Sequence, residues 1–122
     1  MKPSVIKIPA DKITEWESFH DVFQQVLGFP SFYGRNMNAW IDCMTSVDAA
    51  ADGLTTVTVL PGEILILEIG DPIDFRNRRP EQYAALIECS AFVNFRRCEL
   101  GEPPVPALMP LGRLDKGNSH PA

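Results

Sequence analysis

Residues 29–46 read FPSFYGRNMNAWIDCMTS, and this stretch decides how the chain folds around its candidate site. Pro30 cannot continue a preceding helix, Gly34 allows a positive φ, and Asn36 can cap a following helix with its side-chain oxygen. The pattern therefore predicts a tight turn between two helices, with the second helix starting near Met37.

The predicted helix after this turn is amphipathic. At about 100° per residue, apolar side chains gather on one side and polar side chains on the other. The apolar side holds Trp40, Met44 and Val47, and the polar side holds Asn38, Asp42 and Thr45. Ile41 lies at the border, and Phe32 and Tyr33 lie just upstream. Apolar and aromatic surface beside a polar stripe is typical of a protein-contact patch, and simple solvation of the polar face is the alternative.

The segment of residues 19–45 resembles the barstar family of small intracellular ribonuclease inhibitors. The matching residues lie in register without a gap and are Pro30, Tyr33, Gly34, Asn36, Asp42, Cys43 and Thr45. The rest of the chain agrees more loosely, through a strand near each end and an apolar strand that ends in Leu67-Glu68. The resemblance implies a small three-layer α/β fold in which helices pack on a three-stranded parallel sheet.

The resemblance also implies a mechanism. In this family the helix after the Tyr-Gly turn enters the active-site groove of a basic ribonuclease, and the acidic residue that matches Asp42 takes the place of a substrate phosphate. The chain is therefore expected to be an inhibitor or immunity protein, not an enzyme, that needs no cofactor and binds a ribonuclease or nuclease toxin. A barstar-like module that binds a non-nuclease partner is the alternative.

The partner-contact positions that this resemblance implies come mostly from the turn and the helix. They are Phe32, Tyr33, Gly34, Asn38, Ile41, Asp42, Thr45 and Ser46, with Glu88 from a later helix. Asn38 stands where the best-known relative has a second acidic residue, and Ile41 stands where it has a tryptophan. Ser46 replaces a glycine, and Phe32 keeps an aromatic ring without a hydroxyl. We interpret these departures as a change of partner within the same class of target.

Composition predicts one compact cytoplasmic domain. Residues 1–111 are expected to form a monomeric domain, and residues 112–122 are polar and expected to be disordered. No apolar run predicts a signal peptide or a membrane span. The three cysteines, Cys43, Cys89 and Cys98, have no metal-type spacing and are expected to be reduced thiols, with Cys43 in the core.

Charge is distributed unevenly along the chain. Residues 1–72 hold ten acidic and four basic side chains, a net charge of −6, and residues 73–122 hold six acidic and seven basic ones, a net charge of +1. The half that contains the candidate helix is thus the acidic half. An acidic surface attracts basic proteins and repels nucleic acid phosphates, which favours a basic protein over RNA as partner.

Propensity and periodicity predict the remaining elements. Strands are expected at 4–8, 55–60, 64–69 and 105–111, and helices at 14–27 and 80–98. A Thr14–Glu17 capping box should start the first helix, and Tyr83, Leu86, Ile87 and Ala91 should form the buried stripe of the last one. The apolar strand 64–69 should be covered on both faces inside a parallel sheet, and Pro106 and Pro110 confine the last strand to an edge.

Other chemistry is weakly represented. His20 beside Asp21 is expected to be a solvated histidine, because consecutive helical residues do not face each other. The arginines form one basic concentration, composed of Arg76, Arg78, Arg79, Arg96 and Arg97. This group could bind RNA or an acidic partner, and solvated or helix-end charges are the favoured explanation. The sequence contains no assembled catalytic or metal-binding motif.

Overall fold

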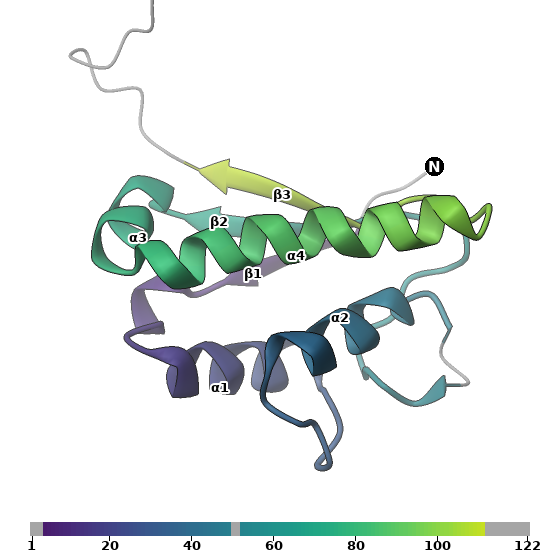
Figure 1. Cartoon of the computed structure of the whole chain (residues 1–122), viewed down its shortest axis with the longest axis horizontal. Helices are drawn as coiled ribbons and strands as arrows, with labels where there is room; N and C mark the ends of the chain where they lie inside the picture. The colour runs from purple at the N-terminus through teal and green to yellow at the C-terminus, as the bar shows by residue number, and fades with distance from the viewer. Residues whose placement is uncertain (1–3, 50–51, 112–122) are drawn as a thin grey trace, which may run out of the picture.

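The computed structural model of the chain describes residues 4–49 and 52–111 (Figure 1). The elements in chain order are β1 (Ser4–Ile8), the 3-10 turn η1 (Ala10–Lys12), α1 (Trp16–Leu27), α2 (Met37–Thr45), β2 (Leu65–Gly70), α3 (Pro72–Arg78), α4 (Pro80–Glu99) and β3 (Pro106–Leu111). The predicted strands at 4–8, 64–69 and 105–111 and the helix at 80–98 are thus confirmed to within one residue. The predicted disorder of 112–122 lies outside the described residues.

The three strands form one parallel sheet in the order β1-β2-β3, which confirms the predicted α/β class and the central place of β2. Ile6 pairs with Leu67, and Leu67 pairs with Leu108, so that one face of the sheet carries a row of apolar side chains. Leu65, Leu67 and Ile69 are buried on this face. The sheet therefore supplies one wall of the core.

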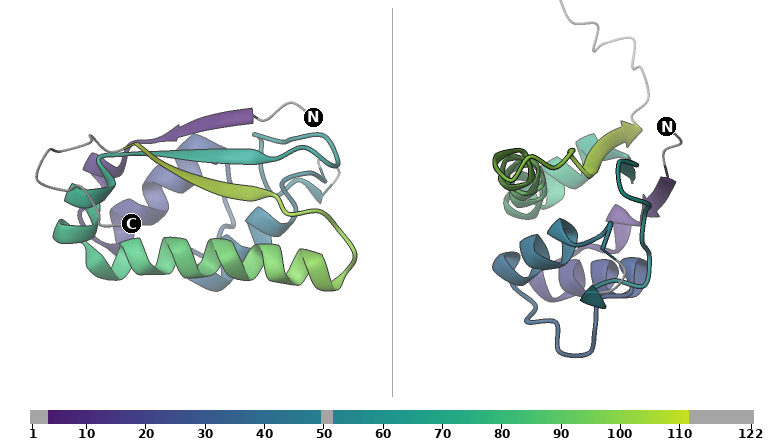
Figure 2. Two further views of the ribbon diagram at one scale, coloured as in Figure 1. Left: turned by 90° about the horizontal axis from the view of Figure 1, so that it is seen from above. Right: turned by 90° about the vertical axis from the view of Figure 1, so that its right-hand side faces the viewer.

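The helices cover one face of the sheet, so that the fold has two layers rather than the expected three (Figure 2). Parallel crossovers are right-handed, and a strand order that advances in one direction places both connections on the same side. On the other face Val5 is 48% exposed, Lys7 is exposed, and Ile66 is half-buried. The expectation that β2 is covered on both faces is therefore wrong.

Helix α1 begins two residues later than predicted. The Ser18 hydroxyl accepts hydrogen bonds from the backbone N–H groups of Thr14 (2.8 Å) and Glu15 (3.0 Å). Both amides that precede the helix are thereby satisfied from one side chain, which makes Glu15 the N-cap residue. The capping box consists of Glu15 and Ser18, not of Thr14 and Glu17.

The segment that follows α2 contains no strand at 55–60, contrary to the prediction. Its backbone donors go to other elements: Thr56 N–H donates to the carbonyl oxygens of Leu27 (3.1 Å) and Gly28 (3.2 Å), and Val59 N–H donates to Val47 O (3.1 Å). Residues 55–60 therefore form an irregular segment, called the strap below, that lies against the ends of α1 and α2.

Gly28 is the residue that permits this contact. It ends α1 in the left-handed conformation with φ of 68°, and a Cβ at this position would lie 1.6 Å from Thr56 Oγ1. Gly53 has nearly the same φ, 67°, but a Cβ there would meet no atom of the described residues within 4 Å. A side chain at either position would strain the backbone, but only a side chain at Gly28 would also clash with a neighbouring residue.

Replacing Gly28 with alanine is expected to destabilise the protein more than replacing Gly53 with alanine. The left-handed conformation costs a non-glycine residue about 1–2 kcal/mol at both positions, and Gly28→Ala must in addition displace Thr56. Urea unfolding of the two variants provides the measurement. Equal losses in the free energy of unfolding would show that the strap does not pack on α1 in this way.

The buried stripe of helix α4 shares only Leu86 with the predicted one. Its buried residues are Gln82, Leu86, Ser90, Val93 and Arg97, whereas Tyr83 is half-buried and Ile87 and Ala91 are exposed. The Ser90 hydroxyl has no hydrogen-bond partner among the described residues, but a buried polar side chain can also find partners on other elements, which a hydrophobic pattern does not register. Arg97 is the clearest example and is described below.

Helix α3 was not predicted. It contains Arg78, a member of the basic group that makes contacts within the protein. Asp71 caps α3 by accepting a hydrogen bond from Asp74 N–H (3.1 Å). Arg78 pairs with Asp74 (2.7 Å) and donates to the carbonyl oxygens of Ile13 (3.0 Å) and Ala10 (3.1 Å). Arg78 thus ties α3 to the start of the chain. No helix among the described residues is both long enough and apolar enough to span a membrane.

Candidate functional site

The turn between α1 and α2 presents one aromatic side chain to solvent. Phe32 is 74% exposed, and the backbone closes behind it through a hydrogen bond from Tyr33 N–H to Pro30 O (2.9 Å). The left-handed residue of the turn is Arg35, with φ of 55°, and not Gly34 as predicted. A Cβ at Gly34 would lie 3.3 Å from Asn36 Nδ2, a close contact that would require the capping side chain to shift slightly.

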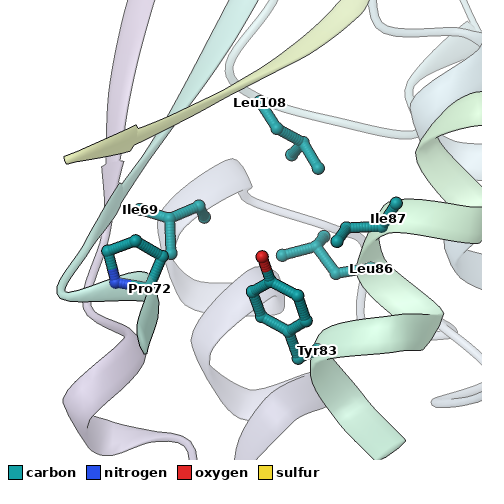
Figure 3. Close-up of a pocket in the computed structure, with 6 residues that line it drawn as sticks. All are labelled: Ile69, Pro72, Tyr83, Leu86, Ile87 and Leu108. Carbon is teal, nitrogen blue, oxygen red and sulfur yellow. The ribbon is translucent and has the colours of Figure 1, made fainter. Parts of the chain in front are cut away.

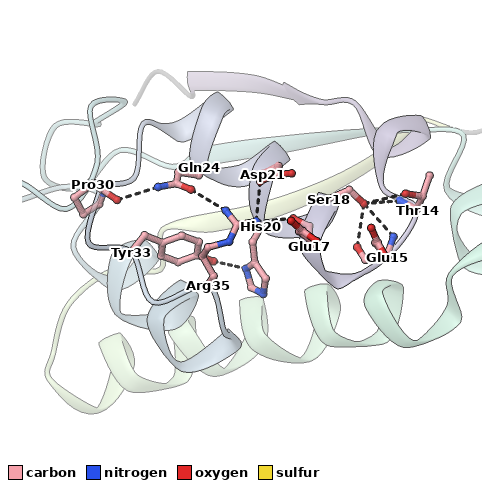
Figure 4. Close-up of polar contacts among 10 residues, drawn as sticks. All are labelled: Thr14, Glu15, Glu17, Ser18, His20, Asp21, Gln24, Pro30, Tyr33 and Arg35. Atoms are coloured by element: carbon pink, nitrogen blue, oxygen red, sulfur yellow. Dashed lines mark hydrogen bonds and ion pairs between the residues drawn. The ribbon is translucent and has the colours of Figure 1, made fainter.

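Arg35 fastens the turn to α1 (Figure 4). Its guanidinium donates to Gln24 Oε1 (2.9 Å), Glu17 O (2.9 Å) and Asp21 Oδ1 (2.7 Å). Gln24 in turn donates to Pro30 O (3.1 Å), so that both ends of the turn are held by the same helix. A contact loop that is held in one conformation loses less entropy when it binds, which favours affinity.

Tyr33 supports the turn from inside. Its ring is 5% exposed and packs on Phe29, with 4.8 Å between the ring centroids. Its hydroxyl lies 2.6 Å from His20 Nδ1, and His20 is itself buried at 4% exposure (Figure 4). The expectation of a solvated His20 is therefore wrong, because its hydrogen-bond partner comes from the following turn and not from its own helix.

The buried His20 is expected to make stability depend on pH. Burial, followed by the nearby Arg35 guanidinium, lowers the pKa of His20 below 6.5, and Asp21 opposes this shift. The unfolded chain therefore takes up a proton near pH 6.5, whereas the folded chain does so only at lower pH. The contribution of neutral His20 is complete above pH 6.5 and is lost as the pH falls through its folded pKa.

Unfolding free energies measured between pH 7.5 and about 5.5 test this expectation, since carboxyl groups titrate mainly below that range. The natural protein should become less stable as the pH falls, and His20→Gln should show a flatter profile in spite of lower stability at pH 7.5. Parallel profiles for the two proteins would exclude His20 as the source of the dependence.

Helix α2 turns its apolar residues inward and its polar residues outward, as predicted. Asn36 caps it by accepting a hydrogen bond from Ala39 N–H (2.8 Å). Trp40, Met44 and Val47 are fully buried, as is Cys43 to within 4%, whereas Asn38 and Asp42 are exposed. Burial, and to a smaller extent the charge of Asp42, raises the pKa of the Cys43 thiol to about 11.

The structure divides the predicted contact residues into three groups. Exposed are Phe32, Gly34, Asn38, Asp42 and Glu88; half-buried are Thr45 and Ser46; buried are Tyr33 and Ile41. The Thr45 hydroxyl donates to Ile41 O (2.6 Å), and Ile41 is 8% exposed. Ile41, predicted at the border between the two helix faces, thus belongs to the buried face, since neighbouring elements cover α2 on that side.

Asp42 lies on the side of α2 that borders α4. Its carboxylate is 65% exposed and has one ionic contact within the described part of the chain, to Arg96 Nη1 at 3.4 Å. Glu88, the α4 residue that the resemblance implies, lies eight residues before Arg96, about 12 Å along the helix. The sequence could not identify Arg96 as a site residue, because its place beside Asp42 depends on how α2 and α4 pack.

Arg97 holds α2 and α4 together at this end of the molecule. It is 1% exposed and makes a two-point contact with Asp48, at 2.6 and 3.0 Å. It also donates to Thr45 O (2.9 Å) and to Pro103 O (2.7 Å). Arg97 lies in the last turn of α4 as expected, but the expectation of a solvated charge is wrong, because acceptors at and after the end of α2 and in the segment after α4 surround it.

A small cavity lies between the sheet and α4 (Figure 3). This cavity of about 200 Å³ is lined by Ile69, Pro72, Tyr83, Leu86, Ile87 and Leu108. The Tyr83 hydroxyl points into it and is the one polar side-chain group of that lining. Binding pockets are larger, roughly 300–1,000 Å³, and combine several convergent polar groups, so that this cavity is a gap in packing.

The candidate site therefore consists of a fastened turn, an exposed aromatic ring and a helix that displays a carboxylate. Within residues 4–49 and 52–111, no cluster of His, Cys, Asp or Glu could hold a metal ion. An exposed polar helix face with an aromatic flank is suited to contact another macromolecule rather than to enclose a small molecule. Fold and site together define a small α/β domain that exposes an aromatic turn and the polar face of a helix.

Comparison with known families gives the more specific assignment. The family model described as Barstar (barnase inhibitor) matches residues 4–99. The chain belongs to the barstar family, which confirms the resemblance inferred from the turn and α2. A search of curated proteins returned no match.

Proposed function

We propose that the chain inhibits a basic ribonuclease or a related nuclease toxin by covering its active site with α2 and the turn before it. The observation that carries this proposal is the presentation of Asp42. Its carboxylate is 65% exposed, lies 3.4 Å from the Arg96 guanidinium, and projects from a helix whose preceding turn is fastened to α1 by Arg35. Such a carboxylate can occupy a site built to bind phosphate.

Charge supports the same partner class. The net charge of −5 attracts a basic protein, and a groove that binds RNA carries the positive charge needed to meet Asp42. Phe32, at 74% exposure, supplies an aromatic side chain of the kind enriched at interface centres. The free thiols of Cys43, Cys89 and Cys98 support a reducing compartment such as the cytoplasm as the place of action.

Direct RNA binding has less support. Two members of the arginine group, Arg78 and Arg97, donate to groups within the protein, so that fewer arginines than the sequence indicates can contact phosphate. The alternative of a module that binds a non-nuclease partner shares the same surface. The two hypotheses predict different results, because binding to a non-nuclease partner would leave RNA cleavage unchanged.

Inhibition of RNA cleavage by a panel of small basic ribonucleases and nuclease toxins tests the proposal. The chain is expected to inhibit at least one enzyme in proportion to its concentration, and a nucleotide that occupies the active site should compete with it. Association should also be faster at low salt, since ions screen electrostatic attraction. Binding without inhibition, or inhibition that the nucleotide does not relieve, would contradict blockage of the active site.

A further inference from the structure

The contact surface carries a positive charge beside its carboxylate. Arg96 of α4 lies 3.4 Å from Asp42 through Nη1, and its side chain is 43% exposed. We propose that Arg96 is a partner-contact residue that selects enzymes with a carboxylate next to the cations of their active site. This inference rests on the proposed function and specifies which members of that target class the chain can bind.

Comparison with Arg97 indicates that the Arg96 side chain contributes little to the stability of the fold. Arg97 is 1% exposed and donates to Asp48, Thr45 and Pro103. Arg96 makes one polar side-chain contact among the residues that the structure describes, and that contact is long and exposed. A guanidinium has five N–H donors, so that most donors of Arg96 can serve a partner. Exposed ion pairs of this kind contribute about 0–1 kcal/mol to stability.

Two exposed aromatic residues lie near Arg96 in the sequence of α4. Phe92 lies one helical turn before it, on the same side of the helix, and is 47% exposed. Phe95 precedes it directly and is 59% exposed. Arginine and aromatic residues together are typical of the centre of protein interfaces. A partner that covers these rings would also remove water from the Asp42–Arg96 pair and so strengthen its interactions with nearby charges.

The charge pattern of the pair determines what the partner must supply. A purely cationic groove would satisfy Asp42 but would bring like charge against Arg96 and remove its water, which opposes binding. A groove with a carboxylate beside its cations satisfies both residues, because each charge then faces an opposite one. Asn38, one turn before Asp42, adds no further negative charge to this surface. The site is therefore matched to a mixed groove.

Charge reversal at Arg96 tests the inference on any ribonuclease that the natural protein inhibits. Arg96→Glu is expected to raise Kd at least about 30-fold, since a buried charge contact is replaced by repulsion. Arg76→Glu makes the same change of net charge at an exposed position on α3 and should raise Kd less than about threefold. Replacing the facing carboxylate of the enzyme with lysine should restore binding to the Arg96→Glu variant.

The outcomes separate this inference from the proposed function. If the natural protein inhibits an enzyme and Arg96→Ala or Arg96→Glu binds as tightly or more tightly, the inference is overturned while the proposed function stands. If the natural protein inhibits no enzyme of the panel, the proposed function fails, and the inference fails with it. Unfolding measurements on both variants, expected to match the natural protein, verify that a loss of affinity is not a loss of folding.

Discussion

Replacing Asp42 with alanine is expected to weaken binding to the target ribonuclease by about 2–5 kcal/mol, or roughly 30-fold to 4,000-fold in Kd. The loss should be this large because the cations of the enzyme that face Asp42 would remain buried without a partner. Titration of RNA cleavage with each protein measures the effect. The free energy of unfolding should change by less than about 1 kcal/mol, since the Asp42–Arg96 pair is exposed.

Two further variants show whether the charge and the position of Asp42 are what matter. Asp42→Asn keeps the shape and the ability to accept a hydrogen bond, and it should lose most of the affinity if the negative charge is essential. Asp11→Ala removes an exposed carboxylate from η1 and should leave inhibition almost unchanged. Full inhibition by Asp42→Ala would show that the family's acidic anchor is not used by this chain.

Replacing Arg97 with alanine is expected to lower the free energy of unfolding by about 3–5 kcal/mol. The change leaves Asp48 with an uncompensated charge in a site where the Arg97 side chain is 1% exposed. It also removes the donors to Thr45 O and Pro103 O, which join the end of α2 to α4 and to the start of β3. Chemical unfolding of the variant at neutral pH measures the loss.

The neighbouring residue provides a matched control for this prediction. Arg96→Ala removes the same side chain from the same helix at an exposed position and should cost less than about 1 kcal/mol. The double variant Asp48→Leu/Arg97→Met should recover part of the loss, because it removes both charges from the site. Similar stabilities for Arg96→Ala and Arg97→Ala would mean that Arg97 is not the residue that joins the two helices.

The sequence predicted several parts of the fold that depend on local chemistry. The cap at Asn36, the inward face of α2 and the ends of the strands follow from side chains acting on their own backbone or on one face of their own element. The apolar run of β2 and the prolines of β3 also predicted the inner place of β2 and the edge place of β3 in the sheet. The family match over residues 4–99 confirms the resemblance seen in a shorter segment.

The errors at His20 and Arg97 concern residues whose environment comes from another element, whereas the errors at the start of α1, at Gly34 and at α3 concern local structure. His20 was expected in solvent, and Tyr33 from the next turn buries it. Arg97 was expected at a solvated helix end, and the end of α2 provides its acceptors. A helical wheel gives the direction of a side chain from its own axis, but it contains no information about what stands in that direction. Polar residues in a core are therefore the ones that periodicity misplaces.

The sequence by itself determined that the chain is a barstar-like α/β protein with an amphipathic helix that displays Asp42, because these features follow from propensity, period and matched residues. Only the tertiary structure decided that Phe32 and not Tyr33 faces solvent, and that Arg96 and not Glu88 stands beside Asp42. These choices depend on how α1, α2 and α4 pack, since a charge meets its neighbour through contacts between residues far apart in the chain. The acidic helix can thus be read from the sequence, whereas the mixed charge of the surface around it arises from the fold.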